Sequence, residues 1–282
     1  MNLASLHGNV RHCWRYRLTF LDFARRMLWT YAYKLPRALL PVSLEIGFRF
    51  RAPIGDVRLV VRNNHGADSF ILGEVFEHEY YSLPLTAPPA TVLDLGANVG
   101  FSAIYFSRSF PSAELACVEP VPSNLECLRT NLERNGVHSQ IFDAAADVAD
   151  GQAWIELARE DYGHKIASAF SGGNLERIQV MAISLPTLMR KLSWERVGLL
   201  KMDIEGHEAK LLTENNEWLH FVDAICVECH EEMSESVLFH VAKQFDFLPP
   251  RNLRGIWFLT RVGPLASSGV AESQGPFGRV GL

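Results

Sequence analysis

The sequence has few cysteines, no long apolar run and no overall excess of basic charge, and each shortage excludes a class of protein. Its five cysteines are odd in number and irregularly spaced among 282 residues, so we expect a reducing compartment rather than a disulfide framework. No run of about 18 apolar residues occurs and no secretory leader is evident, which predicts a cytoplasmic chain without a membrane span. The net charge of −5 argues against a nucleic-acid partner.

Basic charge is nevertheless concentrated near the N-terminus. Residues 1–40 contain seven Lys or Arg and one acid, whereas the remainder contains 20 basic and 31 acidic residues. Residues 9–35 predict one amphipathic helix, which either packs on the main domain with its basic side in water or adheres peripherally to a membrane or an acidic partner. The expected apolar side consists of Leu18, Phe20, Leu21, Leu28 and Trp29, and the basic side of Arg11, Arg15, Arg25 and Arg26.

From residue 91 onward, short apolar runs alternate with helical stretches, which is typical of a parallel sheet covered on both faces. We expect an N-terminal helical and β extension at 1–65, an α/β domain at 66–263 and a disordered tail at 264–282. The extension is expected to contain a strand pair within 44–61, and the domain to end in an antiparallel pair. The other expected strands are 91–96, 113–120, 139–146, 197–205 and 223–230, and the expected helices are 99–109, 122–135, 184–193, 206–216 and 231–244.

The stretch VLDLGANVG contains the first chemical motif. Its spacing, Gly96, Asn98 and Gly100, is not the dinucleotide pattern G-x-G-x-x-G, although glycines before a helix still let a ligand approach main-chain N–H groups. Asp94 precedes the turn, where its charge would repel a pyrophosphate and attract an ammonium group. The motif therefore favours S-adenosylmethionine over NAD.

Two further acids follow the next two strands. Glu119 ends the second strand of the domain and can accept hydrogen bonds from both ribose hydroxyls, and Asp143 can accept one from an adenine amino group. Asp143 can equally be a turn or capping acid. Because the carboxyl ends of parallel strands share one edge, we expect these acids to line a single cofactor site.

With LLKMDIEGHEAKLL the chain resembles the FkbM family of methyltransferases. The resemblance covers roughly residues 70–232 and also rests on VLDLGANVGFSAIYFS, CVEPVPSNLECLRTNLERNG, FDAAADVADGQAWIEL, ISLPTL and ICVECHE, in family order. It implies a class I, Rossmann-like methyltransferase that uses S-adenosylmethionine, with a mostly parallel seven-stranded sheet flanked by helices. Members typically methylate oxygen atoms of sugars or natural products, so a small-molecule or glycan acceptor is implied. By the same resemblance, Asp94, Gly96, Asn98 and Gly100 match the cofactor loop, Glu119 the ribose-binding acid, and Asp203, Glu205 and Gly206 the fourth-strand motif.

The spacing C-x-x-C-H at Cys226, Cys229 and His230 is also that of c-type haem attachment. The surrounding apolar run instead predicts a strand, in which the two cysteines point to opposite faces and fill the core. Glu228 and His230 would then share a face at the edge where Asp203 arrives. We expect Asp203, Glu228 and His230 to be catalytic.

Methyl transfer to an alcohol requires a base, and the candidates at the strand edge are Asp203, Glu228 and His230. His230 can serve because its ordinary pKa is nearest neutrality, with Asp203 either orienting it or holding the acceptor hydroxyl. The same three residues can instead bind a divalent ion that lowers the pKa of the acceptor, although no metal is expected. His207 is a further candidate base or a helix-capping residue, and Glu74, His78, Glu79 and Tyr80 form a polar cluster that predicts either a lid or a surface helix.

Two other functions are compatible with the sequence. A nicotinamide-dependent reductase would retain Glu119 but needs G-x-G-x-x-G and a hydride-transfer partner, neither of which is evident. A Rossmann-like scaffold without catalysis is disfavoured by the intact cofactor loop.

Overall fold

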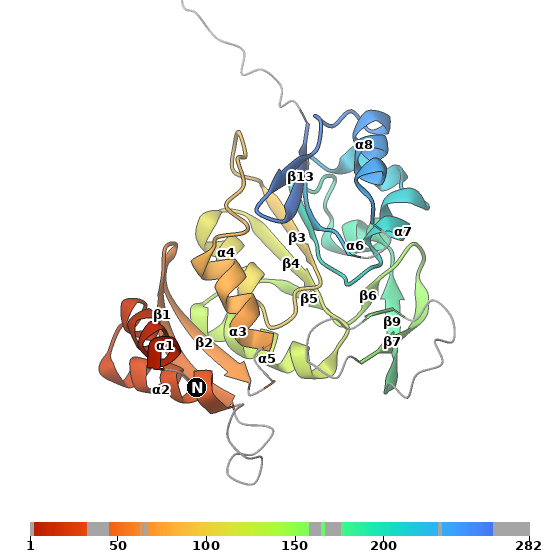
Figure 1. Ribbon diagram of the computed structural model, residues 1–282. Helices are drawn as coiled ribbons and strands as arrows, with labels where there is room; N and C mark the ends of the chain where they lie inside the picture. The colour runs from red at the N-terminus through yellow and green to blue at the C-terminus, as the bar shows by residue number, and fades with distance from the viewer. Residues whose placement is uncertain are drawn as a thin grey trace, which may run out of the picture.

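A seven-stranded sheet forms the centre of the molecule (Figure 1). Five neighbouring strands run parallel, and the strand next to them runs antiparallel to both of its neighbours, which confirms the mostly parallel α/β sheet. In sheet order the strands are β12 (Arg251–Leu253), β13 (Ile256–Thr260), β11 (Ala224–Glu228), β10 (Leu199–Met202), β3 (Thr91–Leu95), β4 (Glu114–Val118) and β5 (Gln140–Phe142). The computed structural model describes residues 3–32, 45–62, 64, 67–157, 165–166, 176–230 and 233–261. The expected tail at 264–282 lies outside the described residues.

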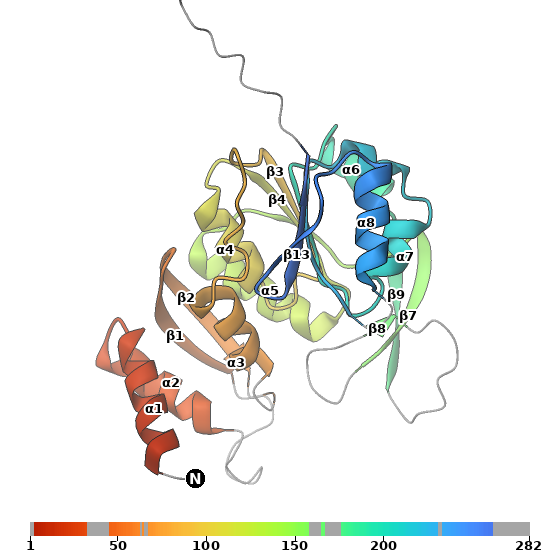
Figure 2. The ribbon, with the colours of Figure 1, turned by 45° about the horizontal axis from the view of Figure 1, so that its top comes forward.

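Helices cover both faces of this sheet, as Figure 2 shows. Successive side chains of a strand point to opposite faces of the sheet, so apolar residues on both faces need a covering layer. Leu199 of β10 packs in one buried apolar cluster, and its neighbour Leu200 packs in the other. Truncating either leucine to alanine would cost about 2–5 kcal/mol, because a cavity would remain. The helices are α4 (Phe101–Ser109) and α5 (Pro122–Asn135) on one face, and α6 (Leu185–Leu192), α7 (Glu208–Thr213) and α8 (Glu235–Gln244) on the other.

A second, four-stranded sheet was not expected from the sequence. Its order is β6 (Ala145–Ala146), β9 (Arg177–Ile183), β7 (Gly151–Glu156) and β8 (Lys165–Ile166). The expected strand at 139–146 is therefore divided between two sheets, because the chain bends at residue 144. The missed signal is the period of two in β7, where Ala153 and Ile155 are buried.

The N-terminal region forms two helices, α1 (Leu3–Arg15) and α2 (Phe20–Ala32), so the prediction of a single helix over 9–35 was wrong. The residues before α2 cap it. The backbone N–H of Thr19 donates to Asp22 Oδ2 at 3.0 Å, and the N–H of Asp22 donates to Thr19 Oγ1 at 3.2 Å. This reciprocal pair satisfies N–H groups that a helix start leaves free, and it explains why a new helix begins here.

The predicted orientation of this region was also wrong, because α2 faces the protein with its charged side. Asp22, Arg26 and Trp29 are buried, whereas Leu21 and Leu28 are exposed. Each of these side chains has a partner, although Arg26 Nη1 makes no hydrogen bond among the described residues: Asp22 accepts from the N–H of Arg49, Arg26 pairs with Glu77 through Nη2, and Trp29 Nε1 donates to the Arg62 carbonyl. Tertiary partners therefore override the amphipathic pattern.

The extension continues into the antiparallel hairpin of β1 (Glu45–Ala52) and β2 (Gly55–Arg62). Buried Asn131 of α5 attaches this hairpin to the domain: its Oδ1 accepts from the N–H of Val60 at 2.7 Å, and its Nδ2 donates to the carbonyls of Val60 at 3.1 Å and Val99 at 2.9 Å. The hairpin and the domain share one apolar core cluster. A short helix, α3 (Ala67–Leu72), and a π-helical turn, Gly73–Glu77, then lead to the domain.

Among the helices that the structure describes, none combines the length and apolar character that crossing a bilayer demands.

Candidate active site

The loop between β3 and α4 lies at the carboxyl edge of the sheet. Gly96 has a φ of 74°, and a Cβ atom there would lie 1.9 Å from the Asp203 carbonyl oxygen, so only glycine permits the close approach of these two strand ends. The N–H of Gly96 donates to the Val118 carbonyl at 3.0 Å. Gly100, with a φ of 86°, precedes α4. Asn98 Oδ1 is buried without a hydrogen-bond partner among the described residues, which fits an acceptor that awaits a ligand donor.

Asp94 lies beneath this loop, fully buried, with its carboxylate 3.0 Å from Lys201 Nζ. Ser102 Oγ donates to Asp94 Oδ2 at 2.6 Å, and Lys201 Nζ also donates to the Gly96 carbonyl at 2.6 Å. Burial opposes the charge of Lys201, but the Asp94 carboxylate outweighs it and holds the pKa of Lys201 well above its usual value. The Asp94–Lys201 ion pair therefore holds the loop between β3 and α4 in its conformation from the buried side.

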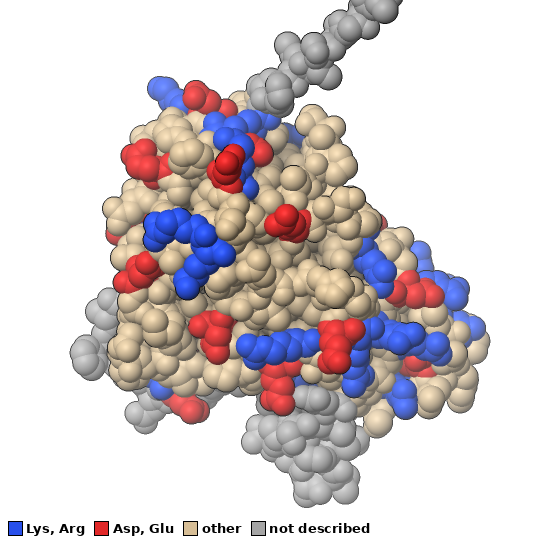
Figure 3. Space-filling view, turned by 180° about the vertical axis from the view of Figure 1, so that it is seen from behind, with Lys and Arg blue, Asp and Glu red and all other residues tan. Residues whose placement is uncertain are grey.

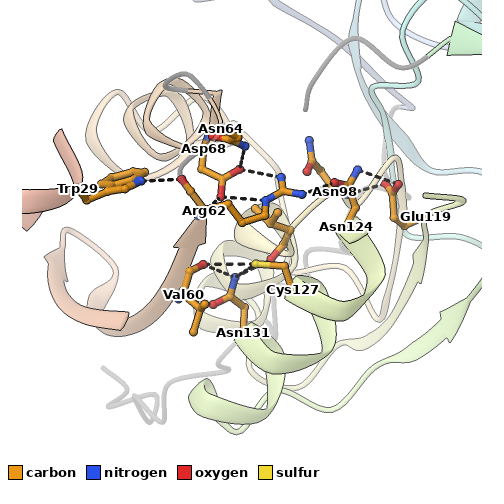
Figure 4. Close-up of polar contacts among 11 residues, drawn as sticks. Trp29, Val60, Arg62, Asn64, Asp68, Asn98, Glu119, Asn124, Cys127 and Asn131 are labelled. Atoms are coloured by element: carbon orange, nitrogen blue, oxygen red, sulfur yellow. Dashed lines mark hydrogen bonds and ion pairs between the residues drawn. The ribbon is translucent and has the colours of Figure 1, made fainter. Parts of the chain in front are cut away.

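Glu119, just after β4, is a buried carboxylate held by three donors, and Figure 4 labels two of the donor residues, Asn98 and Asn124. Its Oε2 accepts from the N–H of Asn98 at 2.9 Å, and its Oε1 accepts from the N–H of Val121 and from Asn124 Nδ2, both at 3.0 Å. Burial raises the pKa of Glu119 despite these hydrogen bonds. Asn124 Oδ1 in turn accepts from Arg62 Nη1 at 2.8 Å, so the N-terminal hairpin reaches the site through one side chain.

The loop after β10 is organised by Glu208, whose side chain is fully buried. Its two carboxylate oxygens accept from the N–H groups of Ile204 and Gly206, each at 2.9 Å. Glu208 Oε1 also lies 3.1 Å from His230 Nδ1, which leaves His230 Nε2 directed towards Glu205 Oε2 at 3.6 Å. Glu208 thus joins the loop to the end of β11.

Two pockets meet at this edge of the sheet. The first, with a volume of about 590 Å³ that includes space open to solvent, is lined by Glu119, Asn124 and residues 144–146. The second, with a volume of about 930 Å³ that also includes open space, is lined by Glu228, His230 and residues of α3 and the π-helical turn. The residues that line both pockets are Gly96, Asn98, Asp203 and Glu205. Two molecules, one in each pocket, would come into contact at these four residues.

The second pocket contains carboxyl groups with raised pKa values. Burial, reinforced by the charge of Glu228, raises the pKa of Glu74 to about 7. Burial, reinforced by Asp203, raises the pKa of Glu228 to about 7. The hydrogen bond to Glu208 raises the pKa of His230 to about 9, against the effect of burial. At neutral pH, His230 is therefore mainly protonated and Glu228 is near its titration midpoint.

The structure brings the three residues expected to be catalytic together. One ligand atom from each of Asp203, Glu228 and His230 lies within 4.8 Å of the other two. Carboxylate oxygens and an imidazole nitrogen are donors that a divalent cation accepts, so these residues could hold a metal ion. The expectation that the protein uses no metal stays a prediction.

The other residues that the sequence analysis singled out differ in whether they line a pocket. Asp143 is exposed just after β5 and does not line the first pocket, so its contact with adenine stays a prediction. His207 Nε2 lies 2.9 Å from Asp147 and lines neither pocket. Of the cluster before β3, Glu74 and Tyr80 line the second pocket, which favours a wall or lid over a surface helix.

The cysteines of the C-x-x-C-H stretch are core residues. Cys226 is fully buried in the cluster on the α4–α5 side of the sheet, and Cys229 packs against the cluster on the other side. The two thiols therefore cannot hold one haem group, as the strand pattern predicted.

Lys201 and Glu208 are site residues that the sequence reasoning did not assign. A signal for Lys201 was available: a lysine within the buried run LLKM requires an acid beside it, and the strand register places Asp94 there. Glu208 had a weaker signal, since an acid in the first turn of a helix is common without any further role.

Comparisons with known proteins find a matching family and several relatives of this chain. The family described as the methyltransferase FkbM domain matches residues 94–249. Methyltransferase 1 of Beauveria bassiana (strain ARSEF 2860) is 23% identical over 181 residues, which cover 56% of this chain and 72% of the relative. The 31-O-demethyl-FK506 methyltransferase FkbM of Streptomyces tacrolimicus is 25% identical over 207 residues, which cover 61% of this chain and 78% of the relative. The structure of M. jannaschii TYW2 in complex with AdoMet has a TM-score of 0.40 at 12% identity, covering 78% of this chain and 89% of that one.

The residues of the first pocket fit S-adenosylmethionine. Gly96 lines the pocket at the strand end, Glu119 offers buried carboxylate oxygens, and Asn98 Oδ1 lacks a donor among the described residues. The family match covers more than half of the chain, from the β3 aspartate to the residues before β12. The chain belongs to the FkbM methyltransferase family, and it is an S-adenosylmethionine-dependent methyltransferase.

Proposed function

We propose that this protein methylates a hydroxyl oxygen of a sugar or natural-product acceptor. The observation that carries the proposal is the junction of the two pockets at Gly96, Asn98, Asp203 and Glu205, with Glu228 in the wall of the second pocket. The first pocket would hold the cofactor and the second the acceptor. In-line transfer requires the acceptor atom and the methyl carbon to meet at such a junction.

In the first pocket, Glu119 would accept hydrogen bonds from the ribose hydroxyls, and Asn98 Oδ1 would accept one from a ligand N–H or O–H group. Asp94 contributes differently from the sequence expectation: its carboxylate is engaged by Lys201 and Ser102, so it would position the loop rather than bind an ammonium group. Bound S-adenosylmethionine supplies a methyl carbon activated by the adjacent positive sulfur.

In the second pocket, we assign the base to Glu228 rather than to His230. An acid with a pKa of about 7 can accept a proton at neutral pH, whereas an imidazole with a pKa of about 9 is already protonated. His230 would instead orient Glu228, whose Oε1 lies 3.8 Å from His230 Nε2. Asp203, on the boundary between the pockets, would hold the acceptor hydroxyl.

The second pocket also indicates the kind of acceptor. Ile71, Val75 and Phe101 give it apolar walls. Both of its cationic groups are engaged, Lys201 with Asp94 and His230 with Glu208, so nothing in the lining is left to neutralise an anionic acceptor. A neutral hydroxyl compound therefore fits better than a phosphate ester. The relative from Streptomyces tacrolimicus carries a name that specifies an O-methyl transfer to a natural product, which supports an oxygen acceptor.

The test is incubation of the full chain with methyl-labelled S-adenosylmethionine and a panel of neutral polyols, glycosides and macrolides. We expect label in an ether product with the wild type, and label that accumulates about 10²–10⁴-fold more slowly with Glu228→Gln, while both proteins bind S-adenosylmethionine equally in calorimetry. Label recovered as an N-methyl product would overturn the oxygen assignment. Binding of S-adenosylmethionine without any labelled product across the panel and a crude metabolite extract would favour a scaffold.

A further inference from the structure

The exposed side of α2 is more apolar than its buried side. Phe20, Leu21 and Leu28 are 70%, 56% and 48% exposed, whereas the charged residues Asp22 and Arg26 are 4% and 6% exposed. A helix that packs only against its own protein and water has the opposite arrangement. The outward side of α2 is therefore suited to a second, partly apolar environment.

Aromatic side chains extend this apolar side towards α1. The ring of Phe23 lies 5.3 Å from that of Trp14 and 5.9 Å from that of Phe20, measured between centroids. Trp14 is itself about half exposed, and the Arg17 guanidinium stacks on it at 3.1 Å. Amphipathic aromatic rings beside arginine are typical of protein surfaces at a membrane–water interface.

A basic groove runs between α2, the β1–β2 hairpin and the end of α5. It is lined by Leu21, Arg25, Leu28, Arg49, Arg58 and Arg134. Arg134 reaches across β1 where Gly47 has no side chain, since a Cβ atom there would lie 2.8 Å from Arg134 Nη1.

Charge on this groove is poorly neutralised. Arg49 pairs with Asp22 at 3.2 Å, but Arg25, Arg58 and Arg134 have no acidic partner among the described residues. In Figure 3, lysine and arginine side chains gather on the part of the molecule formed by the N-terminal helices and hairpin. This concentration contrasts with the net charge of −5 for the whole chain.

We propose that this surface, comprising the groove and the exposed side of α2, docks on a bilayer that contains anionic lipids. The arginines would contact lipid phosphates, while Phe20, Leu21 and Leu28 would enter the boundary between headgroups and acyl chains. A second copy of the chain is a poorer occupant, because a two-fold contact through this surface would place the same unneutralised arginines against each other. The proposal is independent of the identity of the methyl acceptor.

The test is co-sedimentation of the full chain with vesicles of phosphatidylcholine alone and of phosphatidylcholine mixed with phosphatidylglycerol. We expect binding to the mixed vesicles only, weakened by added salt. Arg25→Glu/Arg58→Glu/Arg134→Glu should weaken it by roughly fivefold or more for each arginine replaced. Leu21→Gln/Leu28→Gln should weaken it by about tenfold, because less apolar surface enters the boundary.

Matched controls separate the groove from net charge and from general exposed apolar surface. Arg129→Glu/Lys191→Glu/Lys243→Glu changes the net charge equally at exposed positions outside the groove, and Phe239→Gln/Leu248→Gln removes apolar side chains exposed elsewhere. Both should bind mixed vesicles as the wild type does. The proposal fails if the wild type does not sediment with mixed vesicles, or if the control variants lose as much binding as the groove variants. It also fails if Leu21→Gln/Leu28→Gln changes the oligomeric state in light scattering and leaves vesicle binding unchanged.

Discussion

Lys201 lies beside Asp94 in the register of β10 on β3, with its Nζ 3.0 Å from the Asp94 carboxylate, and both side chains are removed from water. Removing one member of such a pair leaves the other as an uncompensated buried charge. We expect Lys201→Met to lower the free energy of unfolding by about 3–5 kcal/mol. Denaturant titration measures this loss.

The double variant Lys201→Met/Asp94→Asn is the control for that prediction. It removes both charges, so it should recover much of the stability lost by Lys201→Met alone. If the single and double variants were equally destabilised, the loss would arise from packing around Lys201 and not from the ion pair.

Glu119 is predicted to bind the cofactor through its carboxylate. Glu119→Gln keeps the shape of the side chain but replaces one acceptor oxygen with a donor, so we expect the Kd of S-adenosylmethionine to rise by roughly tenfold to a hundredfold, on the basis of about 1.5–3 kcal/mol for a hydrogen bond to a charged group. Calorimetry with the cofactor measures it. Glu126→Gln, at an exposed position of α5, is the matched control and should bind as the wild type does.

The proposed base predicts a particular pH dependence. Because the pKa of Glu228 is about 7 and the base acts when deprotonated, kcat/KM should rise as the pH increases through about 7. It should fall again near pH 9, where His230 loses the proton that partly offsets the surrounding carboxylates. Glu228→Gln should lower the rate by about 10²–10⁴-fold and abolish the acidic limb. A profile in which the acidic limb survives in that variant would assign the base elsewhere.

Glu208 is predicted to set the ionisation of His230. The hydrogen bond that His230 donates to Glu208 is the largest cause of the raised pKa of His230, so Glu208→Gln should lower that pKa from about 9 towards its ordinary value, as followed by NMR titration of the imidazole. Since the folded pKa lies above the unfolded one, protonated His230 stabilises the protein fully below about pH 6.5, and this contribution disappears as the pH rises through about 9. The difference in unfolding free energy between the wild type and His230→Gln should therefore shrink over that interval. A constant difference would show that His230 acts through packing alone.

Asn131 is predicted to hold the N-terminal hairpin on the domain. It satisfies the N–H and carbonyl of Val60 and the carbonyl of Val99, so Asn131→Ala leaves several buried polar groups without partners. We expect a loss of at least ~2 kcal/mol in the free energy of unfolding, on the basis of about 1–3 kcal/mol for each unsatisfied group. Thr130→Ala, at the half-buried neighbouring position whose hydroxyl bonds only to the Glu126 carbonyl within α5, should cost much less. Equal losses would mean that the effect comes from helix propensity.

Much of the domain was predictable because its signals are local. Short apolar runs between helical stretches indicated the parallel strands, and the glycine turn after Asp94 indicated a ligand-binding edge. The period of two in the run before His230 placed Cys226 and Cys229 on opposite faces, which the structure confirms. The small sheet was missed although its main strands, β7 and β9, have six and seven residues, and the alternation that buries Ala153 and Ile155 in β7 was its local signal.

The predictions that failed depended on partners from remote parts of the chain. No local pattern shows that α2 turns Asp22 and Arg26 inward, because the arrangement requires Arg49 of β1 and Glu77 of the π-helical turn. The ionisation of His230 depends on a remote partner in the same way, since its hydrogen bond to buried Glu208 raises its pKa to about 9, and the identity of the base stays a prediction.

The sequence by itself determined the strands of the central sheet and the helices between them, the glycine turn and the acids that reach one edge of the sheet, because backbone conformation and side-chain alternation follow from neighbouring residues. The tertiary structure alone decided which acid is neutralised, which is free to accept a proton and which side of α2 faces outward. Those properties depend on burial and on charges brought together from distant segments, and both exist only once the chain has folded.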